Sequence, residues 1–185
     1  MINPIRNISE IEDTAYNYAV ASTKDVAGLT WIIASQNAPK PPYPYGVISI
    51  ESITEFGTSA SKLGEEYSED IQEFGYQMFR VGIAFTVFGD SAGDILLKLT
   101  TGHTLKSIYN ILKNGGIGFE RFEPSANITV RIEDRVVNTH RVVLSTYVVV
   151  EREQITPFIK SFEGIGFVKE RDKIHLIRVE ADSGN

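Results

Sequence analysis

The sequence predicts an α+β fold with a mixed, largely antiparallel sheet flanked by helices. Three observations lead to this prediction. Residues 8–22, 92–99 and 104–113 carry apolar residues at helical spacing. Residues 77–88 instead alternate between apolar and small or polar side chains, as a strand does. Helices and strands do not alternate strictly along the chain, as they would in a doubly wound parallel sheet.

The first helix is expected from Ile8 to Ser22. Its apolar stripe consists of Ile11, Ala15, Tyr18 and Ala19. Ser9 and Glu12 have the spacing of a capping box, which is typical of the start of a helix.

Two strands and two connecting segments are expected in the next part of the chain. The strands are predicted at Leu29–Ala34, which holds the only tryptophan, and at Val47–Phe56. Between them, four prolines in six residues (39–44) favour extended polyproline geometry. Gly57–Asp70 is polar and rich in acids, which predicts a solvated loop.

The clearest strand is Gln77–Phe88, followed at once by two helices. Its apolar face consists of Phe79, Val81, Ile83, Phe85 and Val87. Ser91 is the expected N-cap of the next helix. The second helix is predicted at Thr104–Lys113, with Leu105, Ile108, Tyr109 and Leu112 on its buried face and glycines at its end.

The remainder of the chain is rich in strand patterns. We expect strands at Ile117–Phe122, Ile128–Ile132, Arg135–Glu151 and Lys173–Val179, with a short helix or turn at Pro157–Glu163. The length of 185 residues suits one domain, 1–185, with residues 1–7 and 181–185 as flexible ends.

Composition and charge exclude several classes of protein. The chain has no cysteine, so disulfides, thiolate zinc sites and thiol nucleophiles are ruled out. Residues 1–74 hold 4 basic and 11 acidic residues, a net charge of −7, and the whole chain has −6. This balance is unsuited to wrapping nucleic acid. No apolar run approaches the roughly 20 residues that span a bilayer, and the first 12 residues lack a signal peptide's apolar core. We therefore expect a soluble, cytosol-made protein without a membrane partner.

Gly89-Asp90-Ser91-Ala92-Gly93 matches the nucleophile elbow of serine esterases. Asp134 or Asp172 and His140 or His175 would complete a triad in the order Ser, Asp, His. An elbow requires a buried parallel strand before it, however, whereas residues 79–87 alternate like a one-sided antiparallel strand. Ser91 as a helix N-cap is therefore the favoured interpretation, and a small serine esterase is the alternative.

No other motif predicts a cofactor or a metal. The glycines at 115–118 follow a helix instead of opening one, which argues against a phosphate loop. The three histidines lack metal-ligand spacing, and the acids at 65–73 do not match a calcium loop. We expect no catalytic, cofactor-binding or metal-binding residues.

The Pro/Tyr segment, residues 39–46, has two possible roles. It could be a ligand of the kind that SH3-type domains bind, which would make the chain a monomeric protein-binding module. The favoured role is a rigid lead-in to the following strand, with Tyr43 and Tyr45 packed at its rim.

The order of these motifs resembles a known family. Pro-Tyr-Pro-Tyr-Gly at 42–46 stands directly before a strand, and a later strand carries Arg80, Phe85, Phe88 and Gly89 before Ser-Ala-x-x-Ile-Leu at 91–96. An Arg-containing β segment, Arg131–Glu151, comes last. Over roughly residues 8–151 this arrangement resembles the neck-terminator and tail-terminator proteins of tailed bacteriophages.

The resemblance implies a structural, non-enzymatic virion protein at the head–tail junction, assembled in the host cytoplasm. Such proteins form a ring, usually a hexamer, that caps the tail tube protein and joins it to a neck connector (an adaptor or stopper) and, where there is one, to the tail sheath. DNA passes through without specific binding, which suits an acidic chain.

The residues expected at interfaces come from two segments. In the first, prolines and tyrosines are expected to contact the tube or neck: Pro39, Pro42, Tyr43, Pro44 and Tyr45. In the second, charges suited to setting the register between subunits include Arg131, Arg135 and Arg141. The segment 135–151 is longer than a usual strand and could offer an unpaired edge to another copy.

Overall fold

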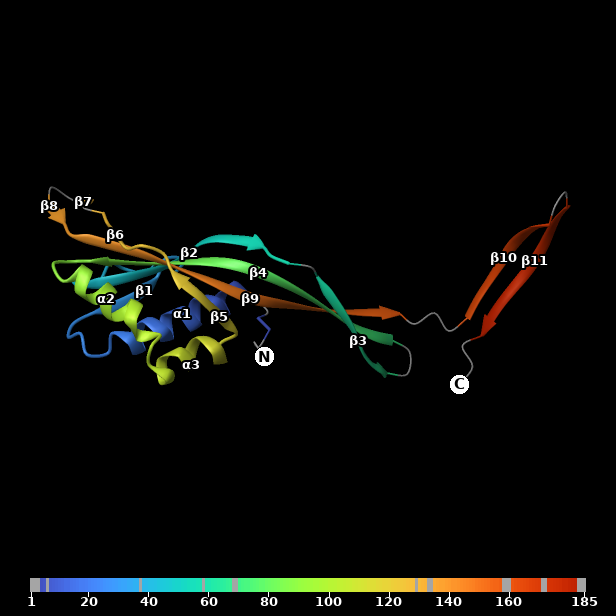
Figure 1. Ribbon diagram of the computed structural model, residues 1–185, viewed down its shortest axis with the longest axis horizontal. Helices are drawn as coiled ribbons and strands as arrows, with labels where there is room; N and C mark the ends of the chain where they lie inside the picture. Colours follow the sequence, from blue (N-terminus) through green and yellow to red (C-terminus); the bar gives the residue numbers. More distant parts are fainter. Residues whose placement is uncertain are drawn as a thin grey trace. The chain divides into compact units, whose positions relative to one another are not determined.

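The computed structural model confirms the predicted α+β class (Figure 1). It describes residues 4–5, 7–36, 38–57, 59–67, 70–128, 130–132, 135–157, 161–170 and 173–182. The chain divides into two compact units, Met1–Ser61 with Gly75–Arg152, and Lys62–Phe74 with Glu153–Asn185. We call the first of these units the body and the other the second unit. A single domain over 1–185 stays a prediction.

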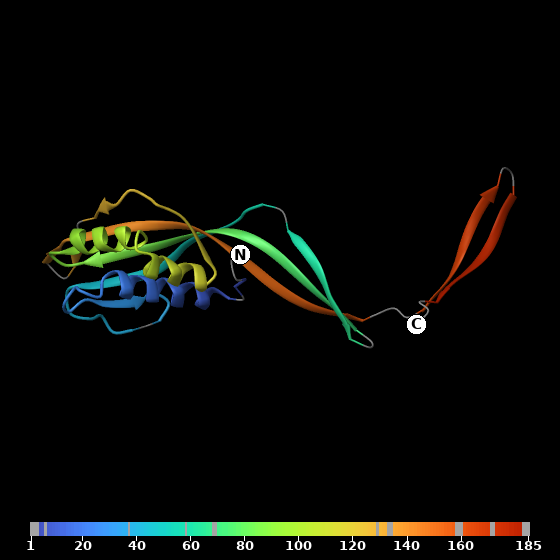
Figure 2. The same cartoon turned by 60° about the horizontal axis from the view of Figure 1, so that its bottom comes forward.

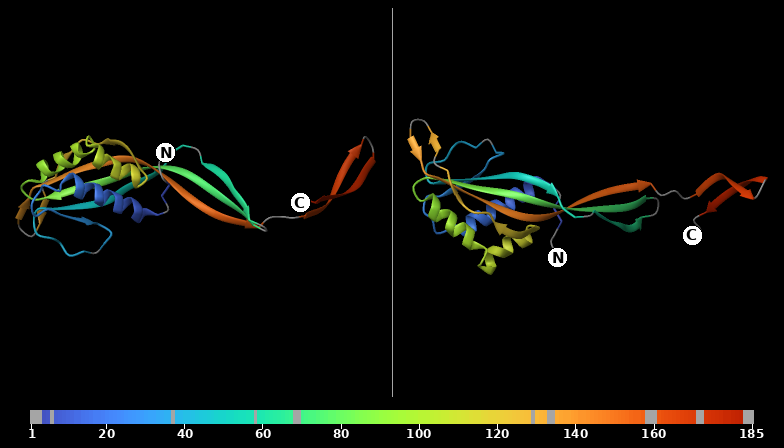
Figure 3. Two further views of the ribbon diagram at one scale, coloured as in Figure 1. Left: turned by 90° about the horizontal axis from the view of Figure 1, so that it is seen from below. Right: turned by 45° about the horizontal axis from the view of Figure 1, so that its top comes forward.

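Three helices are found in the described residues, and all belong to the body. They are α1 (Ile8–Ser22), α2 (Ala92–Gly102) and α3 (Lys106–Asn114). Figures 1 and 3 show all three on the same face of the sheet. The helices of the described residues therefore cover one side of the sheet only.

The bounds of α1 agree with the prediction, but its capping residue lies two positions before the Ser9 of the expected capping box. The side chain of Asn7, not that of Ser9, caps the helix by accepting a hydrogen bond from the backbone N–H of Glu10 at 3.1 Å. Asn7 also donates to the Glu10 carboxylate, so the reciprocal pair uses residues 7 and 10. The predicted apolar stripe is buried, with Tyr18 donating to the carbonyl of Leu99 at 2.7 Å.

The main sheet has seven strands, and its central path runs in the order β1-β2-β4-β9-β5. Strand β3 pairs with β4, and β6 with β9. The strands of this sheet are β1 (Thr30–Ile33), β2 (Tyr45–Glu55), β3 (Ala60–Tyr67), β4 (Asp70–Phe88), β5 (Ile117–Phe122), β6 (Ala126–Asn127) and β9 (Thr139–Pro157). Strands β1 and β2 are parallel, whereas β2–β4, β5–β9 and β6–β9 are antiparallel. Figure 2 shows the twist of the long strands over the helices.

The core lies between this sheet and the helices, and β4 supplies its centre. Val81, Ile83, Phe85 and Val87 are fully buried, as the alternating pattern predicts, and Phe79 is partly buried against them. The ring of Phe85 contacts Tyr18 of α1 and Trp31 of β1. On α3 only half of the predicted face is buried: Ile108 and Leu112 are covered, whereas Leu105 and Tyr109 are 57% and 39% exposed.

The predicted loop at Gly57–Asp70 is wrong over most of its length. Residues 60–67 form β3, and β4 begins at Asp70, seven residues before its predicted start. The pairing of β3 with β4 satisfies the backbone groups of this segment. Backbone pairing therefore makes a strand here despite the polar composition.

The predicted long strand at 135–151 is divided. Residues Arg135–Val137 form β8, which pairs with β7 (Val130–Ile132) in a separate antiparallel sheet, and β9 begins at Thr139. Between His140 and Val148 the segment is internal, because β6 and β5 pair with β9 on one side and β4 lies on the other. The expected free edge is therefore absent over the part of β9 that pairs with β5.

In the second unit, Ser161–Glu170 (β10) and Lys173–Asp182 (β11) form an antiparallel two-stranded sheet. The prediction of a helix or turn at 157–163 is wrong where residues are described, since β9 ends at Pro157 and β10 begins at Ser161; residues 158–160 lie outside the described part. The strand predicted at 173–179 is confirmed and continues to Asp182.

Candidate functional site

The Pro/Tyr segment lies where β2 begins beside the end of β4. Tyr45 stands opposite Phe88 in the register, and their rings stack with centroids 4.7 Å apart. Tyr45 is only 5% exposed, and its burial raises the pKa of its phenol. Tyr43 packs against Tyr45 at 5.4 Å but stays 45% exposed. The predicted rim packing is therefore present, with Tyr45 as the anchor and Tyr43 at the surface.

The prolines before this pair form the outer part of the segment. Pro39 and Pro42 are exposed, and Pro44 is partly buried. The ammonium of Lys40 lies 5.1 Å from the ring centre of Tyr43. Together these side chains present a surface that combines aromatic, proline and cationic groups.

Gly89 contacts two other segments at this end of the body. Its φ of 123° is a conformation that glycine adopts readily, and a β-carbon there would lie 3.3 Å from the Cα of Pro44. Its N–H donates to the carbonyl of Asn138 at 2.9 Å. The Pro/Tyr segment, the end of β4 and the start of β9 therefore meet around one glycine.

The three arginines predicted at interfaces lie on three different strands. Arg131 lies in β7 and Arg135 in β8, where Arg135 stands opposite Ile132; the side chains of both arginines lie outside the described part. Arg141 lies on β9 and forms an ion pair with Glu51 of β2. Both of these side chains remain about one third exposed.

A second ionic cluster, which the sequence analysis did not identify, joins β4, β5 and β9. Arg80 donates to the phenolic oxygen of Tyr147 at 2.8 Å and to the carboxylate of Glu120 at 3.1 Å. Its guanidinium lies 5.4 Å from the ring centres of both Phe56 and Tyr147. The hydrogen bond to Tyr147, with the charge of Glu120, raises the pKa of Arg80. The only signal in the sequence was that Arg80 interrupts an otherwise small-residue face.

A third cluster lies near the end of β5. Glu123 accepts hydrogen bonds from Arg121 at 2.9 Å and from Ser145 at 3.0 Å. Both contacts lower the pKa of Glu123, and the hydrogen bond from Arg121 has the larger effect.

These clusters share the face of the sheet opposite the helices. Arg80, Arg141, Ser145 and Tyr147 each alternate along their strands with residues buried under the helices. The uncovered face is thus polar and carries ion pairs between neighbouring strands. Such preformed charges suit selectivity and register in a protein contact more than raw affinity.

Ser91 has the environment of a helix start. The strand before it, β4, is antiparallel to β2, whereas a nucleophile elbow follows a parallel strand. Ser91 is exposed, and its carbonyl accepts from the N–H of Ile95. The N-cap position is therefore confirmed, but the Ser91 side chain makes no capping hydrogen bond. Of the other proposed triad members, His140 lies beside Gly93, and Asp134 and Asp172 lie outside the described residues.

His103 has a local packing role. Its Nδ1 lies 2.6 Å from the carbonyl oxygen of Thr100, and its ring stacks on Phe119 at 4.6 Å. In the described part of the chain, no three His, Asp or Glu side chains gather as a metal site would require. Nor does any described helix have the length and apolar character needed to cross a membrane.

Comparison with known proteins identifies the family of a chain with this exposed loop and polar sheet face. A search of curated proteins finds no match. The family model described as phage neck terminator protein matches residues 9–172, which is most of the chain and extends beyond the 8–151 of the motif resemblance. The chain therefore belongs to the phage neck terminator protein family.

Proposed function

We propose that copies of this chain form a closed, hexameric ring at the head–tail junction of the virion. The ring caps the tail tube and joins it to a head-side connector, an adaptor or stopper, and to the sheath where the tail has one. DNA passes through the ring without specific binding. Assembly takes place in the host cytoplasm.

The observation that carries this proposal is the family match over residues 9–172. Membership makes the chain a structural protein of the phage neck, and thus a virion component that associates with other phage proteins. The ring, the capping of the tube and the passage of DNA are proposed in addition to family membership.

The ends of the sheet support contact between copies. Strands β1 and β5 terminate the order β1-β2-β4-β9-β5, so each has one edge without a strand partner among the described residues. The two edges belong to different surfaces. A head-to-tail contact between unlike surfaces closes into a ring when the rotation allows it.

The Pro/Tyr segment supports contact with a different protein. Pro39, Pro42 and Tyr43 are exposed, whereas Tyr45 and Pro44 hold the segment against β4 and Gly89. A loop fixed at its base presents its exposed groups with little loss of entropy on binding. We assign this segment to the tube or the head-side connector, and Arg131, Arg135 and Arg141 to the register between subunits.

The charge of the chain supports passage of DNA without binding. The net charge is −6. A ring of such subunits repels phosphate groups, which keeps a moving duplex from adhering to it.

Complementation tests the proposal. Phage grown without this chain should yield filled heads and separate tails, and the purified protein should restore joined, infectious particles. The exposed-serine variant Ser91→Ala should restore them equally well, because no catalysis is involved. Joined particles formed without the chain would contradict the proposal, and failure of a folded Ser91→Ala protein would favour an enzymatic role.

A further inference from the structure

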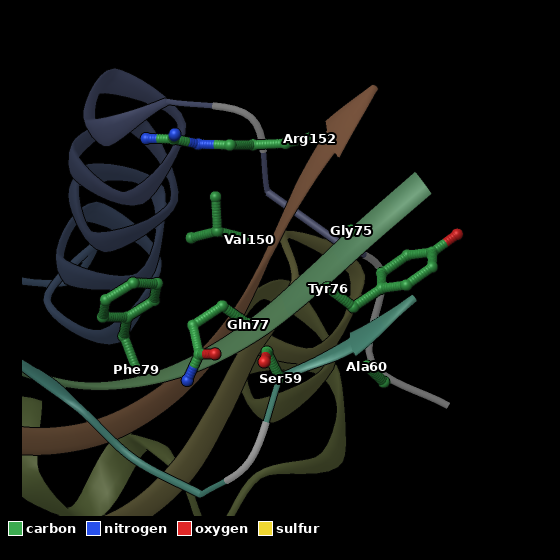
Figure 4. A pocket seen from close by; sticks show the side chains of 8 residues that line it. All are labelled: Ser59, Ala60, Gly75, Tyr76, Gln77, Phe79, Val150 and Arg152. Atoms are coloured by element: carbon green, nitrogen blue, oxygen red, sulfur yellow. The ribbon is translucent and has the colours of Figure 1, made fainter. Parts of the chain in front are cut away.

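An apolar groove lies in the body where the helix-facing side of the sheet extends past the start of α1. Two adjoining hollows, of about 490 and 270 Å³, share Phe79, Val150 and Arg152 as lining residues. Figure 4 shows Phe79, Val150 and Arg152 reaching toward the ribbon of α1, and Tyr76 pointing away. The helix side of the smaller hollow is lined by Ile8 and Ile11.

The groove is open and apolar in the single chain. Ile8 and Ile53, which line it, remain 52% and 45% exposed. Phe79 of β4 and Val148 and Val150 of β9 also line the smaller hollow. Contiguous exposed apolar surface of this kind marks a contact site.

The backbone at the groove also has a free position. Ile5 pairs with Val150 as an isolated parallel bridge, its N–H donating to the carbonyl of Val149 at 2.7 Å. Strand β5 pairs with β9 only as far as Val148. Past this bridge, no strand of the described chain pairs with β9 on its β5 side, so the edge can accept another strand.

In the second unit, the β10–β11 hairpin pairs with no other described strand. Strands β10 and β11 pair only with each other among the described residues, in register from Ser161–Asp182 to Glu170–Lys173. An isolated two-stranded hairpin is marginally stable in water. Eight of its twenty residues are large and apolar: Phe162, Ile165, Phe167, Val168, Ile174, Leu176, Ile177 and Val179. In the sequence these residues fall at both alternating positions of the two strands.

We propose that the β10–β11 hairpin of one copy docks in the apolar groove of the next copy, against Ile8, Ile53, Phe79 and Val150. This inference rests on the proposed ring, because it requires copies in head-to-tail contact. Each copy then donates one hairpin and receives one, so every groove and every hairpin is covered once the ring closes.

The tether is long enough for this exchange. Eight residues lie between Arg152 at the groove and the first residue of β10: the last five residues of β9, 153–157, and residues 158–160. At about 3.3–3.6 Å per residue they span up to roughly 29 Å. This is close to the diameter of a small domain, so the hairpin can reach a neighbouring subunit.

Engineered disulfides test the exchange, because the natural chain has no cysteine. Phage particles are grown in a host that supplies two forms of the chain. One form carries Ile53→Cys, or Ile8→Cys as a second groove position. The other carries Ile165→Cys or Gly166→Cys and a mass tag; these neighbouring positions sample both faces of the strand.

Docking between copies predicts a mixed disulfide dimer in oxidised particles for at least one hairpin position. The exposed Leu97→Cys on α2 replaces the groove cysteine as a control and should give no dimer. A chain carrying both Ile53→Cys and the hairpin cysteine should form a ladder of linked copies. A cyclised single chain instead of a ladder would overturn the inference, because the hairpin would then dock on its own copy.

The outcome separates this inference from the proposed ring. A ring seen at the neck of particles that give no groove–hairpin disulfide would overturn the hairpin exchange and leave the ring in place. Absence of any ring would overturn both.

Discussion

Gly46 lies beneath the indole ring of Trp31, so closely that a β-carbon at position 46 would stand 2.3 Å from Cε3 of the tryptophan. The two residues are partners in the parallel register of β1 and β2. The indole N–H of Trp31 donates to the hydroxyl of Thr23 at 3.0 Å, which fixes the ring just after α1. This contact joins the end of the first helix to the edge of the sheet.

The first prediction follows from this contact. Gly46→Ala should lower the free energy of unfolding by about 1–3 kcal/mol, because the tryptophan ring or the strand has to shift. Denaturant unfolding followed by the fluorescence of Trp31, the only tryptophan, measures the change. Gly75→Ala is the matched control, since its β-carbon would meet only a carbonyl oxygen at 3.9 Å. Equal stability of the two variants would contradict the prediction.

Phe85 tests the core. Its ring is fully buried against Tyr18 and Trp31, so Phe85→Ala should cost about 3–5 kcal/mol of stability. Phe56→Ala removes the same side chain from a site that is 43% exposed and should cost much less. Thermal or urea unfolding of both variants gives the comparison. A loss at Phe85 no greater than at Phe56 would mean that β4 is not the centre of the core.

The two helix starts differ in a testable way. Asn7→Ala should destabilise the protein by about 0.5–2 kcal/mol, because it removes the capping hydrogen bond to Glu10. Ser91→Ala should change stability by no more than about 0.5 kcal/mol, because the exposed hydroxyl caps nothing. Unfolding curves of the two variants should therefore separate, and the reverse order would show that Ser91 is the stronger cap.

The stability of the fold should depend on pH through the carboxylate of Glu123. Arg121 and Ser145 lower its pKa in the folded protein below the ordinary 4.5. Because the folded value is the lower one, these contacts stabilise the fold above pH 4.5, and their contribution is lost as the pH falls through the folded pKa. Carbon-detected NMR titration of the carboxylates measures the shift.

Arg121→Gln should return the pKa of Glu123 toward 4.5. Asp25 serves as an internal reference, since its pKa is lowered by a different residue, Lys98. A Glu123 titration unchanged by the substitution would remove Arg121 as the cause.

Tyr43 tests the assigned contact surface. Tyr43→Ala should leave the fold intact, because the ring is 45% exposed, but should reduce the yield of joined particles. Tyr16→Ala, at an exposed tyrosine of α1, is the control and should assemble normally. Plaque yield and the fraction of unjoined tails give the readout. Normal joining by the Tyr43 variant would remove the Pro/Tyr segment from the interface.

The sequence predicts best where large apolar side chains recur at the spacing of one element. Residues 79–87 and the stripe Ile11–Ala19 could be assigned because their large apolar side chains follow strand or helix spacing on the face that packs in the core. Strand β3 and the first residues of β4, 70–76, were missed because these two strands pair through backbone groups, which a polar composition does not reveal. The exposure of Leu105 and Tyr109 was missed because helical spacing does not show how wide a face is covered.

The candidate contact surface was only partly predictable. The prolines and Tyr43 stand out in the sequence, and the structure places Tyr43 at the surface. The ion pairs Arg80–Glu120 and Arg141–Glu51 join residues 40 and 90 positions apart, so only the sheet register reveals them. Local patterns carry no information on such distant pairs.

Cryo-electron microscopy of intact particles decides whether the ring exists. We expect a closed ring of copies of this chain, six in number, between the end of the tail tube and the head-side connector. Density for single copies on one side of the neck, or none at the head–tail junction, would contradict it.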